Sequence, residues 1–130
     1  MHAPITALWA GLLGLLLLFL SGRVVNARNR EKILFGDGGN AVLQRHIRVH
    51  ANFAEYVPLG LVLLLVLELN GASPRLLNLL GGGLVVARLL HAFGLSRSAG
   101  TSVGRFVGTV ATWLVLTAES GLALYTYWAG

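Results

Sequence analysis

The sequence predicts an all-α integral membrane protein with four spanning helices in a single domain, residues 1–130. Of the 130 residues, 55% are hydrophobic and only 12% are charged, and the mean hydropathy is +0.73. A soluble domain carries about 25% charged residues, so this composition places the chain in the membrane class. Apolar runs that are long enough to span a bilayer, which takes about 20 residues each, recur along the chain.

The ten basic residues give a formal net charge of +5, and they flank the apolar runs instead of forming one patch. The positive-inside rule produces this distribution, so we interpret it as membrane orientation and expect no nucleic-acid binding. The basic connections, 23–45 and 96–102, are therefore expected in the cytoplasm, with both termini outside. The chain has no cysteine, which excludes disulfides and cysteine nucleophiles. Any thiol chemistry must use the thiol of a bound cofactor.

The first helix is expected over residues 4–26, because residues 5–22 are apolar and carry no charge. A cleaved signal peptide is the alternative for such a run. The four residues before the run contain no Lys or Arg, whereas a signal peptide has a basic start, so we expect a retained helix. Residues 36–39, Gly-Asp-Gly-Gly, are expected to form a turn, because their spacing fits neither glycine-rich phosphate-binding motif.

The second helix is expected over residues 40–70, with Asn40 as its N-cap and Pro58 as a local kink. Glu55 lies fifteen residues before Asn70, which is roughly 22 Å along a helix axis. The hydrocarbon core of a bilayer is about 30 Å thick. Glu55 is therefore predicted to lie inside the membrane, near its cytoplasmic boundary.

The third and fourth helices are expected over residues 74–95 and 101–128. In the fourth helix, Gly104 and Gly108 form a pair of small residues suited to close helix packing. The aromatic residues at the end of this helix are typical of a belt at the membrane interface. Glu119 is a solitary acid in the outer half, and we interpret it as structural.

The densest polar cluster of the sequence lies in the second helix, where charged groups are costly to bury and so indicate a functional site. At helical spacing, Arg48, Asn52 and Glu55 share one face, while His46 and His50 lie on a roughly opposite face. Polar groups on two faces cannot both avoid lipid, so a neighbouring subunit is expected to cover one face. A metal site at the histidines is a weaker alternative, because no third ligand is evident, and we expect no metal.

Together with Tyr56, Arg88 and Arg105, this cluster could hold an anionic, amide-rich ligand at the membrane face. Guanidinium groups bind carboxylates through two hydrogen bonds, Asn offers both a donor and an acceptor, and Glu can bind an ammonium group. Arg88 stands among apolar residues, and Glu55 is its expected partner. The alternative is that these charges are structural, paired with one another or extended toward lipid headgroups.

The sequence RVHANFAEYVP at residues 48–58 resembles the signature of the MAPEG family, the membrane-associated proteins in eicosanoid and glutathione metabolism. The triplet Ala-Arg-Leu at residues 87–89 supports this resemblance, and the glycine-rich turn makes the chain most similar to the small bacterial members. The resemblance implies a homotrimer in the bacterial inner membrane, with glutathione bound between subunits near the cytoplasmic face. It implies glutathione contacts at Arg48, His50, Asn52, Glu55, Tyr56, Arg88 and Arg30, with Arg28 as the alternative to Arg30.

Two departures from the family's pattern bear on catalysis. Eukaryotic members carry tyrosines after the third-helix arginine, where this chain has His91 and Leu95. The arginine that activates the thiol near the start of the fourth helix has no direct match, and Arg105 is the nearest candidate for this catalytic role. The resemblance therefore implies glutathione binding, with glutathione transferase or peroxidase activity toward lipophilic substrates that enter from the bilayer.

Two other functions remain as alternatives. One is a non-catalytic member of the same fold that binds a lipid or another ligand. The other is a small drug–proton exporter, which has a similar length and number of spans. Such exporters resemble one another in an acidic residue within the first helix, and residues 5–22 contain none.

Overall fold

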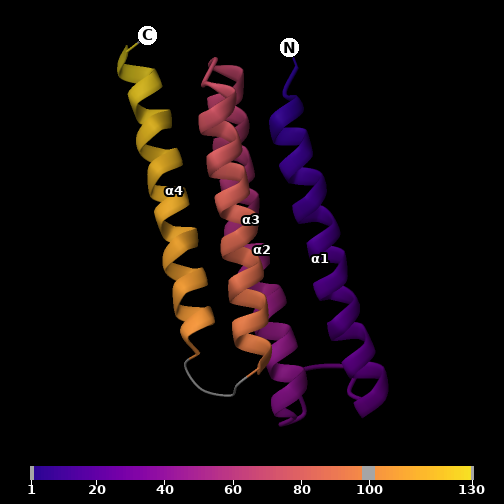
Figure 1. The fold of residues 1–130 in the computed structure, drawn as a ribbon. Helices are drawn as coiled ribbons and strands as arrows, with labels where there is room; N and C mark the ends of the chain where they lie inside the picture. The colour runs from indigo at the N-terminus through magenta and orange to yellow at the C-terminus, as the bar shows by residue number, and fades with distance from the viewer. Residues whose placement is uncertain (1, 98–101, 130) are drawn as a thin grey trace.

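The computed structural model describes residues 2–97 and 102–129, apart from the side chains of residues 95–97. It confirms an all-α chain of four helices that run up and down along one axis (Figure 1). The helices are α1 (Pro4–Glu31), α2 (Ala41–Leu69), α3 (Pro74–Arg97) and α4 (Val103–Ala129). The expected start of the last helix at residue 101, and most of the connection over 96–102, lie outside the described residues.

The helices α2 and α3 form the centre of the bundle, and α1 and α4 flank them. Each outer helix packs against both central helices, whereas α1 and α4 do not approach each other within the described residues. Both termini lie at one end, and the α1–α2 connection lies at the other end (Figure 1). We call the end with the α1–α2 connection the basic end.

The first helix is longer than its apolar run predicts. It ends at Glu31, whereas the sequence predicts an end at residue 26. Arg28 and Arg30 occupy its last turn, where basic side chains interact favourably with the helix dipole. Lys32 then ends the helix in the left-handed conformation, with φ of 57°. These last turns are polar and stand beyond the apolar span.

The start of α1 is tied to the end of α2. Pro4 takes the first turn of α1, where its missing N–H has no helical partner to lose. The Glu68 carboxylate of α2 accepts the next backbone N–H groups, from Ile5 at 2.9 Å and from Thr6 at 2.6 Å. A carboxylate at this position also complements the positive end of the helix dipole.

The second helix begins as its sequence predicts. The Asn40 side-chain oxygen accepts the N–H groups of Val42 at 3.0 Å and Leu43 at 2.9 Å, so Asn40 is confirmed as the N-cap. Pro58 lies inside the helix, which continues to Leu69. The chain then reverses at Gly71, whose φ of 80° favours glycine.

Glycines bring the backbones of α3 and α4 into contact near the basic end. A Cβ atom on Gly108 would lie 2.5 Å from the backbone nitrogen of His91 and 2.8 Å from the carbonyl oxygen of Ala87. A Cβ atom on Gly104 would lie 3.1 Å from the Cα atom of Gly94. The close packing predicted for Gly104 and Gly108 is therefore confirmed.

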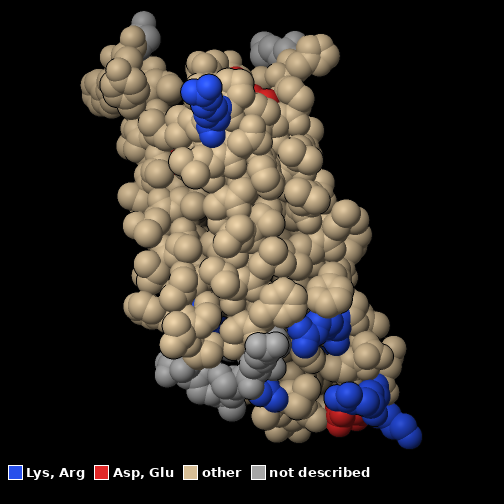
Figure 2. Space-filling view, viewed as in Figure 1, with Lys and Arg blue, Asp and Glu red and all other residues tan. Residues whose placement is uncertain are grey.

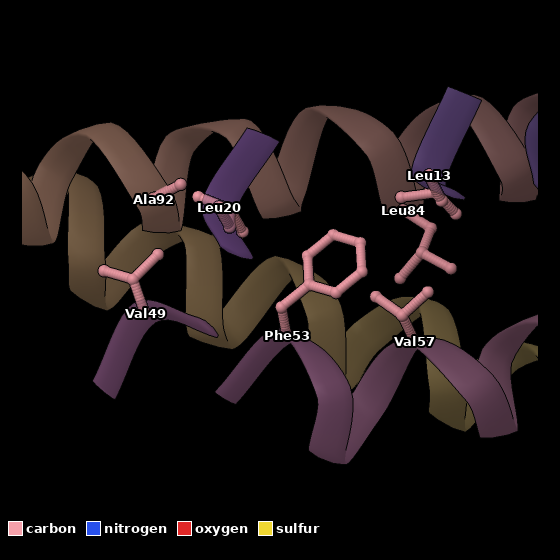
Figure 3. Close-up of a cluster of buried hydrophobic side chains, with 7 residues drawn as sticks. All are labelled: Leu13, Leu20, Val49, Phe53, Val57, Leu84 and Ala92. Atoms are coloured by element: carbon pink, nitrogen blue, oxygen red, sulfur yellow. The ribbon is translucent and has the colours of Figure 1, made fainter. Parts of the chain in front are cut away.

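Two clusters of buried apolar side chains fill the interior. Figure 3 shows the first cluster, in which side chains of α1, α2 and α3 meet: Leu13, Leu20, Val49, Phe53, Val57, Leu84 and Ala92. The second cluster joins α2 and α3 nearer the chain termini: Leu64, Leu67, Leu77 and Leu80. The two clusters hold α1, α2 and α3 together along most of their length.

All four described helices are long and apolar enough to cross a membrane. On the face drawn in Figure 2, most Lys and Arg side chains gather at the basic end, and the middle of the face carries no charge. At the other end, Tyr125, Tyr127 and Trp128 are exposed, as expected for an interfacial aromatic belt. The candidate site residues of α2 lie in the half of the bundle nearer the basic end.

Candidate functional site at the basic end

A buried arginine joins three helices in the half of the bundle nearer the basic end. Arg88 of α3 is only 1% exposed. Its Nη2 group donates to the Asn52 Oδ1 atom of α2 at 2.7 Å, and its Nη1 group donates to the Thr112 Oγ1 atom of α4 at 3.2 Å. The guanidinium carbon also lies 6.0 Å from the ring centroid of Phe53. Arg88 therefore binds the Asn52 amide oxygen on the side of Asn52 that faces the interior of the bundle.

The expected ion pair between Arg88 and Glu55 is wrong. Among the side chains that the structure describes, the only ion pair joins Arg30 and Glu31, with 2.9 Å between Nε and Oε1. Positions three apart on a helix differ by about 60° around its axis. Asn52 therefore faces α3, while Glu55 is turned to the outside of the bundle and is exposed.

The exposed side of α2 carries the other predicted ligand contacts. Arg48 and Glu55 are exposed, and Asn52 and Tyr56 are half-buried beside them. Within the described part of the chain, Arg48 and Glu55 make neither an ion pair nor a side-chain hydrogen bond. We call these four residues the α2 polar face. It offers a guanidinium group, an amide, a carboxylate and a phenol within about two and a half turns of helix.

His50 lies away from the α2 polar face and is covered by α1 of the same chain. Its Nε2 atom is 3.0 Å from the Ser21 hydroxyl oxygen. That hydroxyl donates its hydrogen to the Leu17 carbonyl oxygen at 2.9 Å, so the His50 Nε2–H must donate to Ser21. Helix α1 of the same chain therefore covers the His50 side of α2. The expectation that a neighbouring subunit covers one face of α2 stays a prediction for the opposite, exposed face.

The two candidate arginines after the first apolar run have different surroundings. Arg28 Nη1 donates to three carbonyl oxygens of the following connection, at 2.8–3.3 Å, and so holds this connection in place. Arg30 pairs with the adjacent Glu31 and remains exposed. Within the described residues, neither arginine forms a hydrogen bond or an ion pair with the α2 polar face, so the role of Arg30 as a ligand contact stays a prediction.

Arg105 and His91 flank the contact between α3 and α4. Arg105 is exposed and lines a shallow groove of about 250 Å³ on the outer side of α4, together with Phe106 and Trp113. His91 is only 3% exposed, behind the Gly108 backbone. It therefore offers no surface group where the resemblance would place a tyrosine, and the Leu95 side chain lies outside the described set.

Sequence reasoning missed two hydroxyl groups that hold the site. Thr112 and Ser21 both donate to the carbonyl oxygen four residues earlier in their own helices, at 2.7 and 2.9 Å. This bond is common for hydroxyls in helices and carries no information about function. What matters is the second bond of each hydroxyl, to Arg88 and to His50, and only the packing of the helices reveals it.

Comparison with known proteins identifies the family. The MAPEG family model matches residues 6–125, which is nearly the whole chain. The chain belongs to the MAPEG family. The inner membrane protein YecN from Escherichia coli K12 is 38% identical over 112 residues, covering 86% of this chain and 84% of YecN. YecN from Escherichia coli O6:H1, strain CFT073, matches to the same extent. This MAPEG chain is thus an integral membrane protein with four candidate spans, similar to YecN.

Proposed function

We propose that this MAPEG protein binds glutathione at its α2 polar face and transfers it to lipophilic electrophiles. The observation that carries the proposal is the polar face itself, where exposed Arg48 and Glu55 flank an Asn52 amide held by Arg88. Glutathione combines carboxylates, an ammonium group and peptide amides. A guanidinium, a carboxylate and an amide are the complementary set of partners, and the family membership supports the same ligand.

The proposed reaction uses the glutathione sulfur, since the chain has no thiol of its own. The thiol loses its proton to solvent, and the thiolate attacks an electrophilic carbon of the lipophilic substrate. A carbon–sulfur bond forms while the bond to the leaving group breaks, and the leaving group departs with the electron pair. We propose Arg105 as the group that stabilises the thiolate, because a nearby guanidinium favours the ionised form.

A lipophilic peroxide is the second proposed substrate class for the same thiolate. The sulfur attacks one peroxide oxygen, and the oxygen–oxygen bond breaks to leave an alcohol and a sulfenic acid. A second glutathione thiol then displaces water from the sulfenic acid, which gives glutathione disulfide. Two glutathione thiols are oxidised and the peroxide is reduced, so no other reductant is needed.

We propose that the chain assembles as a homotrimer in the inner membrane, with the basic end in the cytoplasm. Charged groups on a spanning helix are costly to expose to lipid, which favours a neighbouring subunit over Arg48 and Glu55. The basic end fits the positive-inside rule, and the similar protein YecN is named an inner membrane protein. Native mass spectrometry tests the trimer. A reporter that is active only in the cytoplasm, fused after Ala129, tests the orientation. Activity of this reporter would contradict it.

The binding test uses calorimetric titration of the detergent-solubilised protein with glutathione. Arg48→Ala and Glu55→Ala are each expected to weaken binding by about 2 kcal/mol, the scale of a lost charge-assisted hydrogen bond, or roughly thirtyfold. Gln44→Ala is the matched control, because Gln44 is exposed on the same helix outside the polar face. Unchanged affinity in correctly assembled Arg48 and Glu55 variants would rule out this site, and a wild-type protein that ignores glutathione would rule out the function.

A non-catalytic ligand-binding role is the second candidate. It is favoured by the burial of His91, which leaves no surface phenol or imidazole from α3 at the site. Incubation with glutathione and chlorodinitrobenzene separates the two functions. A transferase produces the coloured thioether, whereas a binding protein takes up glutathione and forms none.

A further inference from the structure

A chain of hydrogen bonds connects α4 with the α2 polar face through Arg88 of α3, which donates to both sides. The Thr112 hydroxyl donates to the Gly108 carbonyl oxygen at 2.7 Å, so its oxygen is left to accept from the Arg88 Nη1 group at 3.2 Å. Arg88 Nη2 then donates to Asn52 Oδ1 at 2.7 Å. A guanidinium group has donors and no acceptor. Every bond in the chain therefore has one possible direction.

The direction of the hydrogen bond from Arg88 to Asn52 determines which groups Asn52 can offer to a ligand. Because Arg88 can only donate, the Asn52 amide must turn its oxygen inward and its Nδ2 group away from Arg88. Within the described backbone and side chains, Nδ2 makes no hydrogen bond to the protein. Asn52 is half-buried, beside exposed Arg48 and Glu55. The amide therefore presents two N–H donors, and no acceptor, toward the outside of α2.

The charge behind the amide favours the same kind of ligand group. Arg88 is 1% exposed and Thr112 is 0% exposed, so neither can touch a ligand at the polar face. Within the described residues no carboxylate pairs with Arg88. Its positive charge therefore polarises the amide toward stronger donation and disfavours an ammonium group at this position.

We propose that Thr112 is a positioning residue, which acts through Arg88 to hold Asn52 as a donor for an oxygen acceptor of the ligand. This inference rests on the proposed glutathione site. It assigns a carboxylate or peptide carbonyl of glutathione to Asn52, and it leaves the ammonium group to the exposed Glu55. Thr112 contributes through the orientation of the amide and makes no contact with glutathione.

The test compares Thr112→Val with Thr112→Ser. Valine has the shape of threonine but can neither accept from Arg88 nor donate to Gly108, whereas serine keeps the hydroxyl. Thr126→Val is the matched control, because the Thr126 hydroxyl donates at 2.7 Å to the carbonyl of Ala123 in the same helix, without an arginine partner. We expect Thr112→Val to weaken glutathione binding about fivefold, the effect of one lost hydrogen bond, and Thr112→Ser and Thr126→Val to bind as the wild type does.

A spectroscopic measurement follows the amide directly. In protein labelled with ¹⁵N-asparagine, the side-chain signal of Asn52 is identified by its absence in Asn52→Asp. Thr112→Val is expected to shift or broaden this signal, and Thr112→Ser is expected to leave it in place. A general loss of packing would move the signals of all asparagines and would not be rescued by serine.

Asn52→Asp tests the donor role without disturbing Thr112. Aspartate can accept from Arg88 and pair with it, so the variant should be at least as resistant to thermal unfolding as the wild type. It has no N–H to offer, however, and we expect it to bind glutathione at least tenfold more weakly. A folded Asn52→Asp protein that binds glutathione normally would overturn the assignment of an acceptor to this position.

Failure of the inference differs from failure of the proposed function. If the wild type binds glutathione and Thr112→Val binds it equally well with an unmoved Asn52 signal, the positioning role is overturned and the function stands. If the wild type does not bind glutathione, the function is overturned. The Asn52 signal in the valine and serine variants then still decides whether Thr112 positions the amide.

Discussion

Among the described side chains, an arginine and a glutamate are almost fully buried, and their surroundings differ. Arg88 is 1% exposed and donates hydrogen bonds to Asn52 and Thr112. Glu119 of α4, in the half nearer the chain termini, is 0% exposed, and within the described residues neither carboxyl oxygen has a hydrogen-bond partner. Its Oε2 atom lies 3.6 Å from where a Cβ atom on Gly60 would be, against the backbone of α2. Arg88 belongs to a chain of hydrogen bonds that reaches the α2 polar face. Within the described residues, the Glu119 carboxyl group belongs to no such chain.

This difference shows that burial of a charge in a spanning helix is not enough to identify a functional site. Both side chains meet that criterion, which makes each a candidate by default. Only Arg88 is connected to exposed polar groups, through Asn52 on the α2 polar face. We therefore expect changes at Arg88 to affect ligand binding and changes at Glu119 to leave it intact.

The largest effect is expected from Arg88→Met. Methionine fills much of the space but leaves the Asn52 and Thr112 oxygens without their donor, which should lower the free energy of unfolding by about 3 kcal/mol. Glutathione binding should also be lost, because the Asn52 amide is no longer held. Thermal unfolding in detergent measures the first effect, and calorimetry the second.

Arg75→Met is the matched control for this substitution. Arg75 is exposed at the start of α3, at the opposite end from the α1–α2 connection. A surface change of this kind should alter the free energy of unfolding by less than about 0.5 kcal/mol. If Arg75→Met and Arg88→Met prove equally mild, the buried network has no role in stability.

Gly108→Ala should disrupt the close contact between α4 and the backbone of α3. Its new Cβ atom would press on the backbone of α3, 2.5 Å from the His91 nitrogen, and a backbone cannot move aside as a side chain can. We expect the free energy of unfolding to fall by about 2 kcal/mol, within the range for overpacking. Gly121→Ala is the control on the same helix, since nothing lies within 4 Å of its added Cβ atom. Equal stability of the two variants would contradict the close contact of α3 with α4.

Arg105→Ala examines thiol activation separately from binding. An arginine close to a thiol lowers its pKa by roughly 1–3 pH units, from about 8.5 for a free thiol. The variant should therefore raise the pH midpoint of thiolate absorbance for bound glutathione by at least about 1 pH unit, and slow conjugation near neutral pH. An unmoved midpoint with an unchanged conjugation rate would make Arg105 a lipid-facing anchor.

The smallest effect is expected from Glu119→Gln. Glutamine keeps the size and shape of the side chain, and no hydrogen bond of the carboxyl group is lost within the described residues. Glutathione affinity should stay within twofold of the wild type, and the free energy of unfolding should change by less than about 1 kcal/mol. A tenfold loss of affinity would place Glu119 in the site and would end the contrast with Arg88.

The sequence predicts the four helices well because each is marked by its own apolar run. Asn40 as a helix cap and Gly104 and Gly108 as close contacts were also predictable, because each depends on local chemistry. The polar end of α1 was not, since residues beyond an apolar run can continue a helix or leave it. The length of a helix inside the membrane follows from the length of its apolar run. In water, the end of a helix depends on weaker effects, such as helix propensity and charges that interact with the helix dipole.

The partner of Arg88 shows where sequence reasoning stops. Helical periodicity places Asn52 and Glu55 on one side of α2, but it does not say how α2 is rotated against α3. A rotation of about 60° decides whether the amide or the carboxylate meets the guanidinium. The same ambiguity hid Thr112, whose local hydrogen bond is unremarkable and whose contact with Arg88 arises from packing.

The attachment of α1 has a consequence for bilayers of different thickness. Glu68 of α2 accepts hydrogen bonds from Ile5 and Thr6 at the N-terminal end of α1, and His50 of α2 donates to Ser21 toward the other end. Both anchors belong to α2, so α1 cannot slide independently along it. A thinner or thicker bilayer should therefore be met by tilting of α1 and α2 as one rigid pair.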